Sequence, residues 1–229
     1  NNAQIEQILM KIGIQKGYSI THDEMLDDIE GDGSKGYRVS GNVGNSTSNN
    51  IIVYTDKDGN VSVGDYDIVP ILDEFVEEHP DFAYHGHKAI LAFTGYNGVL
   101  GYRTDETFDP NSSALDPKNK ANPNIEEDKA TVKKITQVLK DDGYEFASHS
   151  WGHINFTNRS LEDIKRDTDR WKRNVEPLLP DSCDILLYPF GADIGDWHPY
   201  KKGGENGKYD LLEEAGFRYF CNVDSTQIW

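Results

Sequence analysis

The stretch that decides the fold is residues 126–148, EEDKATVKKITQVLKDDGYEFAS, in which a helical pattern is followed directly by a strand pattern. Over 126–140 the apolar residues recur at helical spacing, and they are Val132, Ile135, Val138 and Leu139. Gly143 then predicts the end of the helix, because glycine readily takes the backbone conformation in which helices stop. Residues 144–148 have the length of a strand. A helix that leads straight into a strand is typical of a repeating α/β unit.

The same alternation extends outward in both directions. Further strands are predicted at 51–54, 89–93, 184–188 and 217–223. Further helices are predicted at 69–75, after the capping residue Ser160, and at 209–215. The polar stretch 104–124 is predicted to be a long loop that lines a site. This order predicts an α/β fold with a parallel sheet, and in such folds chemistry collects at the carboxyl ends of the strands.

The length of 229 residues suits one main domain with a small N-terminal addition. Residues 1–30 have helical spacing, and residues 31–50 are rich in Gly, Ser and Asn, which predicts a loop or a hairpin. We therefore expect an N-terminal helical and loop segment at 1–50 and the α/β unit at 51–229. The chain begins without Met, which is typical of a mature or trimmed product.

The composition excludes several classes of partner. With 23 Lys and Arg against 40 Asp and Glu, the net charge is −17, which argues against binding to nucleic acid or to anionic lipid. No apolar stretch approaches the roughly 20 residues of a membrane helix, so we expect no membrane insertion. Cys183 and Cys221 are too few for a disulfide framework or a four-thiolate zinc site. Each lies beside an apolar run, so we expect two buried thiols.

The sharpest chemical signal is the pair His149 and His153, which follows the strand predicted at 144–148. On a helical turn, two histidines four positions apart share one face, so both imidazole rings can reach one metal ion. The alternative interpretation is that one or both are ordinary surface histidines.

A second signal is residues 186–193, LLYPFGAD, where an apolar strand breaks into the turn Pro189-Phe190-Gly191. Such a turn can direct a backbone N–H group and an aromatic ring into a cleft, although it is also compatible with an ordinary strand-to-loop turn. Asp196 and Trp197 follow, an acid beside the largest aromatic side chain. The alternative there is a tryptophan packed under a loop and a solvated acid.

In this order, the segments resemble the polysaccharide deacetylase family, also called carbohydrate esterase family four or the NodB-homology domain. The family's His-Ser/Thr-x-x-His motif is matched by residues 149–153. Its Arg-x-Pro-Tyr/Phe-Gly motif is matched at residues 189–191, but Leu187 stands in the place of the arginine. Its Asp-x-x-Asp-Trp motif fits residues 193–197. The resemblance covers about 51–229, and residues 94–104 with Trp171 resemble a secreted Gram-positive subgroup.

This resemblance implies a distorted (β/α) barrel that removes N- or O-linked acetyl groups from a polysaccharide such as peptidoglycan, a chitin-like polymer or xylan. It implies a divalent metal, zinc foremost and otherwise cobalt, nickel or manganese, bound by His149, His153 and a carboxylate. It implies a carboxylate that takes a proton from water, and a Phe190 N–H group that helps to hold the oxyanion. Asp196 is expected to be catalytic. The residues expected to contact substrate are Tyr188, Pro189, Trp197 and Trp151. The implied location is extracellular or at the cell wall.

The family's first motif, Thr-Phe-Asp-Asp, is not intact, and two placements compete. In the first, residues 55–58 are a degraded copy, with Asp56 as base and Asp58 as metal ligand, although Lys57 lies between them and would repel a cation if it pointed inward. In the second, residues 18–24 are the motif, with Glu24 as ligand, and residues 55–60 are a hairpin turn. A third interpretation is that neither pair contacts metal. We favour the first placement narrowly.

The resemblance also implies a last strand and a Leu-x-His motif, and neither is found before Trp229. Two functional classes therefore stay open: a metal-dependent deacetylase, and a degenerate barrel that binds carbohydrate without hydrolysing it. A barrel with neither ligand nor activity is a third. The acidic charge favours an uncharged or amine-bearing glycan over an anionic wall polymer.

Overall fold

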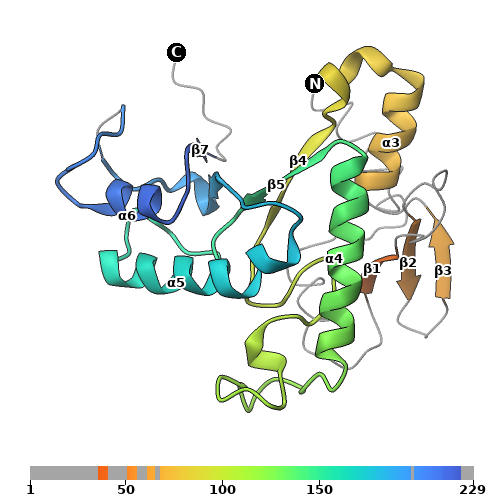
Figure 1. The fold of residues 1–229 in the computed structure, drawn as a ribbon, viewed down its shortest axis with the longest axis horizontal. Coiled ribbons are helices and arrows are strands. Elements are labelled where there is room, and N and C mark those ends of the chain that lie inside the picture. Colours follow the sequence, from red (N-terminus) through yellow and green to blue (C-terminus); the bar gives the residue numbers. More distant parts are fainter. Residues whose placement is uncertain (1–35, 41–50, 56–60, 65–67, 197–198, 223–229) are drawn as a thin grey trace.

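The computed structural model describes residues 36–40, 51–55, 61–64, 68–196 and 199–222, which contain two sheets and several helices (Figure 1). The first sheet contains β1 (Gly36–Ser40), β2 (Ile51–Thr55) and β3 (Val61–Gly64). The second contains β4 (Ala89–Phe93), β5 (Tyr144–Ser148), β6 (Ile185–Tyr188) and β7 (Tyr219–Asn222). The helices are α3 (Ile68–Glu78), α4 (Ile125–Asp141), α5 (Leu161–Asn174) and α6 (Lys208–Glu214). Short 3₁₀ turns are η2 (Pro80–Phe82), η3 (Tyr84–Gly86), η4 (Glu106–Phe108), η5 (Glu176–Leu178) and η6 (Pro189–Gly191).

The second sheet is parallel, and its strands lie in chain order, β4-β5-β6-β7. Phe93 pairs with Ser148, and Tyr188 pairs with Asn222, so the carboxyl ends of the strands meet at one edge. The α/β prediction is therefore confirmed, as are the strands at 89–93 and 144–148. Within the described ranges the sheet is open, so the predicted barrel is not confirmed.

The helices cover this sheet through the apolar faces that their periodicity predicts. On α4, Val132, Ile135 and Leu139 are fully buried, whereas Val138 is only half-buried. Thr136, two residues before Val138, is buried although it is polar. Its hydroxyl is satisfied there because it donates a hydrogen bond of 2.6 Å to the Leu178 carbonyl oxygen. In Figure 1, α5 and α6 lie side by side, at some distance from α3. The largest buried side chains of the core are Trp171, Tyr144, Tyr188, Phe156 and Phe217.

The start of α5 is capped as predicted. The Ser160 hydroxyl oxygen accepts a hydrogen bond of 3.1 Å from the Asp163 N–H group and donates one of 2.8 Å to the Asp163 carboxylate. This satisfies one of the backbone donors that every helix start leaves without an intrahelical partner. The α5 helix then contacts the loop at residues 149–153, which carries the candidate site.

The first sheet is antiparallel, with β2 in the middle. β1 comes from the predicted 1–50 segment and pairs with β2, the start of the predicted 51–229 unit. A boundary at residue 50 would therefore divide one sheet. Within 31–50 only β1 is described, as a strand paired with β2. The helices predicted within 1–30 lie outside the described residues.

An ion-pair cluster lies at the amino end of the parallel sheet, at the opposite end from the candidate site. The Lys88 ammonium group is 2.7 Å from Asp73 and 3.1 Å from Asp142. The Tyr144 hydroxyl donates a hydrogen bond of 2.8 Å to Asp73. Burial raises the pKa of Tyr144, so its hydroxyl stays a donor at neutral pH. The cluster therefore ties α3 to the residues that begin β4 and β5.

Two further predictions concern membrane helices and cysteines. Among the described helices, none combines the length and the apolar character that crossing a membrane requires. Both cysteines are free thiols; Cys183 is buried as predicted, and Cys221 is only half-buried. Burial raises the pKa of the Cys183 thiol, which keeps it protonated and unreactive.

Candidate functional site

The loop at residues 149–153 leaves the carboxyl end of β5 and carries both predicted metal-binding histidines. It is not helical, so the prediction that the pair lies on a helical turn is wrong. Ser150 and His153 instead have left-handed backbones, with φ of 60° and 51°. These two residues bend the loop, and the two imidazole rings still lie side by side, edge to face, with centroids 4.9 Å apart and an interplanar angle of 62°.

The ring of His149 is oriented by the neighbouring strand. Its Nδ1 lies 3.0 Å from the carbonyl oxygen of Leu187 at the end of β6. A carbonyl oxygen only accepts hydrogen bonds, so Nδ1 carries the proton and Nε2 keeps a lone pair. Burial lowers the pKa of His149, which favours the neutral ring that metal binding requires. Because a backbone carbonyl makes this contact, it does not depend on the side chain at position 187.

Two serines shape the loop from within. The Ser148 hydroxyl accepts a hydrogen bond of 3.2 Å from the Ser150 N–H group, and the Ser150 hydroxyl accepts one of 3.0 Å from the Ile154 N–H group. Ser150 is 2% exposed, so its hydroxyl satisfies a backbone donor that water does not readily reach. This gives a physical reason for a hydroxyl residue directly after His149.

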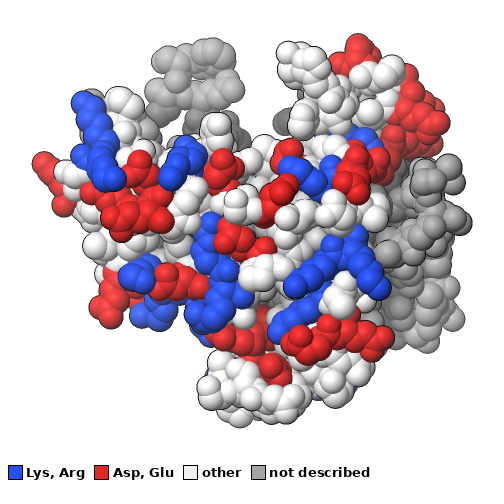
Figure 2. Space-filling view, viewed as in Figure 1, with Lys and Arg blue, Asp and Glu red and all other residues white. Residues whose placement is uncertain are grey.

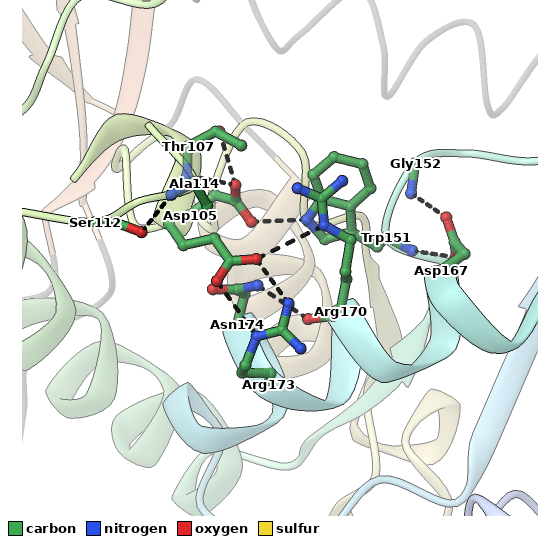
Figure 3. A network of polar contacts seen from close by, with 11 residues as sticks. Asp105, Thr107, Ser112, Ala114, Trp151, Gly152, Asp167, Arg170, Arg173 and Asn174 are labelled. Atoms are coloured by element: carbon green, nitrogen blue, oxygen red, sulfur yellow. Dashed lines mark hydrogen bonds and ion pairs between the residues drawn. The ribbon is translucent and has the colours of Figure 1, made fainter. Parts of the chain in front are cut away.

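Asp167 on α5, which is not among the site residues predicted from the sequence, also supports the loop. Its two carboxylate oxygens each accept a hydrogen bond of 2.8 Å, from the N–H groups of Trp151 and Gly152 (Figure 3). Burial raises the pKa of Asp167, and these two hydrogen bonds oppose that shift. A signal was present in the sequence, because Asp167 is an acid on the buried stripe of α5 between Ile164 and Trp171.

Trp151 lies between the two histidines and is itself held by polar contacts. Its indole N–H group donates a hydrogen bond of 2.7 Å to Asp105, and the Arg170 guanidinium lies 3.7 Å from the centre of its ring (Figure 3). Its carbonyl oxygen accepts hydrogen bonds from the N–H groups of Gly95 and Tyr96. The half-buried ring is thus bound to the protein at its edge and on one face.

The turn after β6 places the other predicted residues in two different environments. Tyr188 and Pro189 are buried, and the Tyr188 ring packs against Phe156 in the core. Phe190 is 67% exposed, has φ of 62°, and lies with its ring centroid 4.5 Å from that of His153. The left-handed backbone therefore brings the Phe190 ring beside the histidine pair.

The acidic segment that follows is organised around Asp193. Its carboxylate accepts hydrogen bonds from the Gly195 N–H group at 2.8 Å and from the Tyr200 hydroxyl at 3.0 Å. Burial, together with the nearby Asp193 carboxylate, raises the pKa of Tyr200, so this hydroxyl remains a donor. Asp196 is half-buried in the same segment, and the predicted substrate residue Trp197 lies outside the described residues.

The proposed carboxylate ligands also lie outside the described residues, both Asp56 with Asp58 and Asp23 with Glu24. The strands on either side of 56–60 are described, and Thr55 of β2 pairs with Val61 of β3. Residues 56–60 thus connect two antiparallel strands, and β2 does not belong to the parallel sheet. Within the described part of the chain, no group of three His, Cys, Asp or Glu side chains could hold a metal ion.

A hollow of about 450 Å³ lies over α5, and neither His149 nor His153 lines it. Its lining residues are Glu106, Glu162, Lys165, Arg166, Asp169, Arg170 and Arg173. Figure 2 shows Lys and Arg interspersed with Asp and Glu over the face of the molecule that it draws. Within the hollow, Lys165 pairs with Asp169 at 2.6 Å and Arg173 with Glu106 at 2.7 Å. Since opposite charges compensate one another there, we assign it no ligand.

The fold and the site define an α/β protein with a pair of adjacent imidazole rings at the carboxyl edge of its parallel sheet. In a comparison with known families, residues 107–201 match the family model for polysaccharide deacetylase. The matched segment includes the histidine loop, Asp167 and the turn after β6, and it supports assignment to this family. The match covers less than half of the chain and suggests a hydrolase acting on amide or ester bonds of a carbohydrate. No curated protein and no solved structure matches the chain.

Proposed function

We propose that the protein is a metal-dependent carbohydrate deacetylase whose divalent ion, zinc foremost, is bound by His149, His153 and a carboxylate. The observation that carries this proposal is the orientation of His149, whose Nδ1–H group is occupied by the Leu187 carbonyl. In metalloproteins, a ligating histidine almost always donates its second ring N–H group in this way. The ring of His153 lies beside that of His149, with centroids 4.9 Å apart, and is proposed to supply the second nitrogen.

In this proposal the bound ion supplies Lewis acidity, polarising the acetyl carbonyl and lowering the pKa of a water molecule. His149 and His153 hold the ion with neutral rings. A carboxylate of the first motif accepts the proton of the attacking water. The Phe190 N–H group donates to the oxygen of the acetyl group as negative charge develops there. Asp196, on the segment after β6, is the remaining residue proposed to be catalytic.

For the third ligand, the topology favours Glu24, with Asp23 as the base, over Asp58 with Asp56. An active-site carboxylate is expected at the carboxyl edge of the parallel sheet. Residues 56–60, however, join β2 and β3 of the antiparallel sheet. The second placement expects a hairpin turn at residues 55–60, and the antiparallel pairing of β2 with β3 supports it. Glu24→Gln is therefore expected to weaken zinc binding, whereas Asp58→Asn leaves it unchanged; the reverse result would support the first placement.

We further propose that the parallel sheet is part of a distorted barrel and that the protein acts outside the cell or at the cell wall, as in the secreted Gram-positive subgroup. The net charge of −17 supports an uncharged or amine-bearing glycan as substrate. Trp197 and Trp151 are proposed to contact this glycan, and Tyr188 and Pro189 to shape the base of its site. Preferential binding to an anionic wall polymer in a glycan panel would contradict the substrate class.

The test combines zinc content with acetate release from acetylated chito-oligomers and acetylated xylan. The wild type is expected to bind one zinc ion and release acetate, and His149→Asn is expected to do neither. His85→Asn is a matched control, because His85 is an exposed histidine before β4 and should leave both readouts unchanged. Wild-type protein that binds no zinc would overturn the proposal.

A second candidate is a carbohydrate-binding barrel without hydrolytic activity. Leu187 favours it, because an uncharged side chain replaces the arginine of the family motif. Zinc binding and glycan binding without acetate release from any substrate would support this candidate over the deacetylase.

A further inference from the structure

We propose that Asp167 is a positioning residue for the metal site, and this inference rests on the proposed function. Asp167 contacts neither imidazole ring in the proposed role; it acts on the backbone between them. By accepting the N–H groups of Trp151 and Gly152, it holds the loop in the shape that brings His149 and His153 to one ion.

The contact between Asp167 and the loop is buried and uses both carboxylate oxygens. Asp167 is 6% exposed, and its two oxygens receive consecutive backbone N–H groups at 2.8 Å each (Figure 3). A Cβ atom on Gly152 would lie 3.1 Å from the same carboxylate, so the side chain packs directly against the loop backbone. Hydrogen bonds to an ionised acceptor are shorter and stronger than neutral ones, which offsets the cost of burying the charge.

The loop needs such support because its backbone is unfavourable. Ser150 and His153, on either side of Trp151 and Gly152, both have positive φ, which non-glycine residues adopt only when their surroundings stabilise it. Without the carboxylate, two backbone donors would lack these acceptors in a poorly solvated place. Rotation of these peptide groups toward other acceptors would change the φ angles of Trp151 and Gly152 and, with them, the path of the chain that carries the His153 ring beside His149.

Other contacts hold Trp151 of this loop in place. Asp105, itself 1% exposed, accepts the indole N–H group of Trp151. The Trp151 carbonyl accepts from Gly95 and Tyr96 beyond the end of β4. With Trp151 held from these sides, the Asp167 carboxylate determines the direction of the two N–H groups and hence the path of the chain to His153.

The test is Asp167→Asn, which preserves size but offers one acceptor oxygen and directs an NH₂ group at the second backbone N–H. Zinc affinity, measured by competition with a chelator, is expected to fall about 10- to 100-fold, the range found when groups supporting metal ligands are replaced. The matched control is Asp169→Asn on the same helix, whose exposed carboxylate pairs with Lys165 and should leave zinc affinity unchanged. Gly152→Ala, which crowds the carboxylate without removing it, should give a smaller loss in the same direction.

A second readout uses metal-free protein and is independent of zinc binding and of activity. In NMR spectra, the amide protons of Trp151 and Gly152 should lie far downfield in the wild type and move upfield in Asp167→Asn. The nuclear Overhauser contacts between the rings of His149 and His153 should weaken at the same time.

The outcomes separate this inference from the proposed function. Wild-type protein that binds no zinc overturns the proposed function, and the ring contacts in metal-free protein still decide whether Asp167 positions the pair. Wild-type protein that binds zinc, together with an Asp167→Asn variant of equal affinity and unchanged ring contacts, overturns the inference. A lower melting temperature with unchanged affinity also overturns it, because Asp167 would then serve stability alone. Were Asp167→Asn to remain unfolded, the Gly152→Ala affinity would decide the question.

Discussion

Replacing Trp151 by phenylalanine separates a structural role of this side chain from sugar stacking. Trp151→Phe keeps an aromatic ring under Arg170 but removes the N–H group that lies 2.7 Å from Asp105. A hydrogen bond to a charged group contributes about 1.5–3 kcal/mol to stability. Asp105 keeps its bonds to the backbone N–H and the hydroxyl of Thr107, at 2.9 and 2.7 Å, which limits the loss. We therefore expect a loss of about 2 kcal/mol in the free energy of unfolding.

For a chain of this length, about 2 kcal/mol lowers the melting temperature by about 4–8 °C. The assay is thermal unfolding of the metal-free protein followed by far-ultraviolet circular dichroism, which does not depend on tryptophan fluorescence. Tyr84→Phe is the control, because Tyr84 is 79% exposed and its change should stay within about 0.5 kcal/mol. A Trp151→Phe variant that melts with the wild type but binds glycan more weakly would refute the structural role and support sugar stacking.

Three further predictions concern stability. Thr136→Val should lower the free energy of unfolding by about 1–3 kcal/mol, because the buried Leu178 carbonyl loses its 2.6 Å hydrogen bond, and an equally stable variant in urea unfolding would contradict this. Gly143→Ala should cost at least about 1–2 kcal/mol by the same measurement, because φ is +96° and the new Cβ would overlap the Gly86 carbonyl oxygen; a neutral effect would mean that this turn rearranges easily. In metal-free protein, burial lowers the pKa of His149 from its ordinary 6.5, so the unfolded chain binds more protons below that value. The contribution of His149 to the free energy of unfolding should therefore be fully present above pH 6.5 and be lost as the pH falls through the folded pKa. His149→Asn should reduce the difference between the free energies of unfolding measured at about pH 7.5 and about pH 5.5.

Much of the parallel sheet and its helices could be predicted because their signals are local. The apolar spacing of 126–140 predicts α4, which extends from Ile125 to Asp141. Strands predicted at 89–93 and 144–148 are found at those positions. β1 lies in a segment predicted only as loop or hairpin, because residues 31–50 are rich in Gly, Ser and Asn, although Tyr37 and Val39 alternate with polar residues in GYRVS. Its strand is paired with β2, which local composition does not reveal.

The site was only partly predictable, because its shape depends on contacts between residues that are distant in the sequence. The spacing of His149 and His153 suggested a shared metal, but it also suggested a helical turn, which the structure does not contain. The loop takes its shape from Asp167 and Asp105, which lie far away in the sequence, and no local pattern weighs such contacts. An acid on the buried stripe of an amphipathic helix was the one available clue to Asp167.

The sequence by itself determined the order of helices and strands, and hence that the two histidines would stand at the carboxyl edge of a parallel sheet. Periodicity and turn residues act within a few positions along the chain, so they can be recognised without coordinates. Only the tertiary structure decided which nitrogen of His149 keeps its lone pair, because the Leu187 carbonyl that sets the tautomer is 38 residues away. It likewise decided the left-handed path of the loop, since that backbone is stable only while hydrogen bonds from other elements hold it.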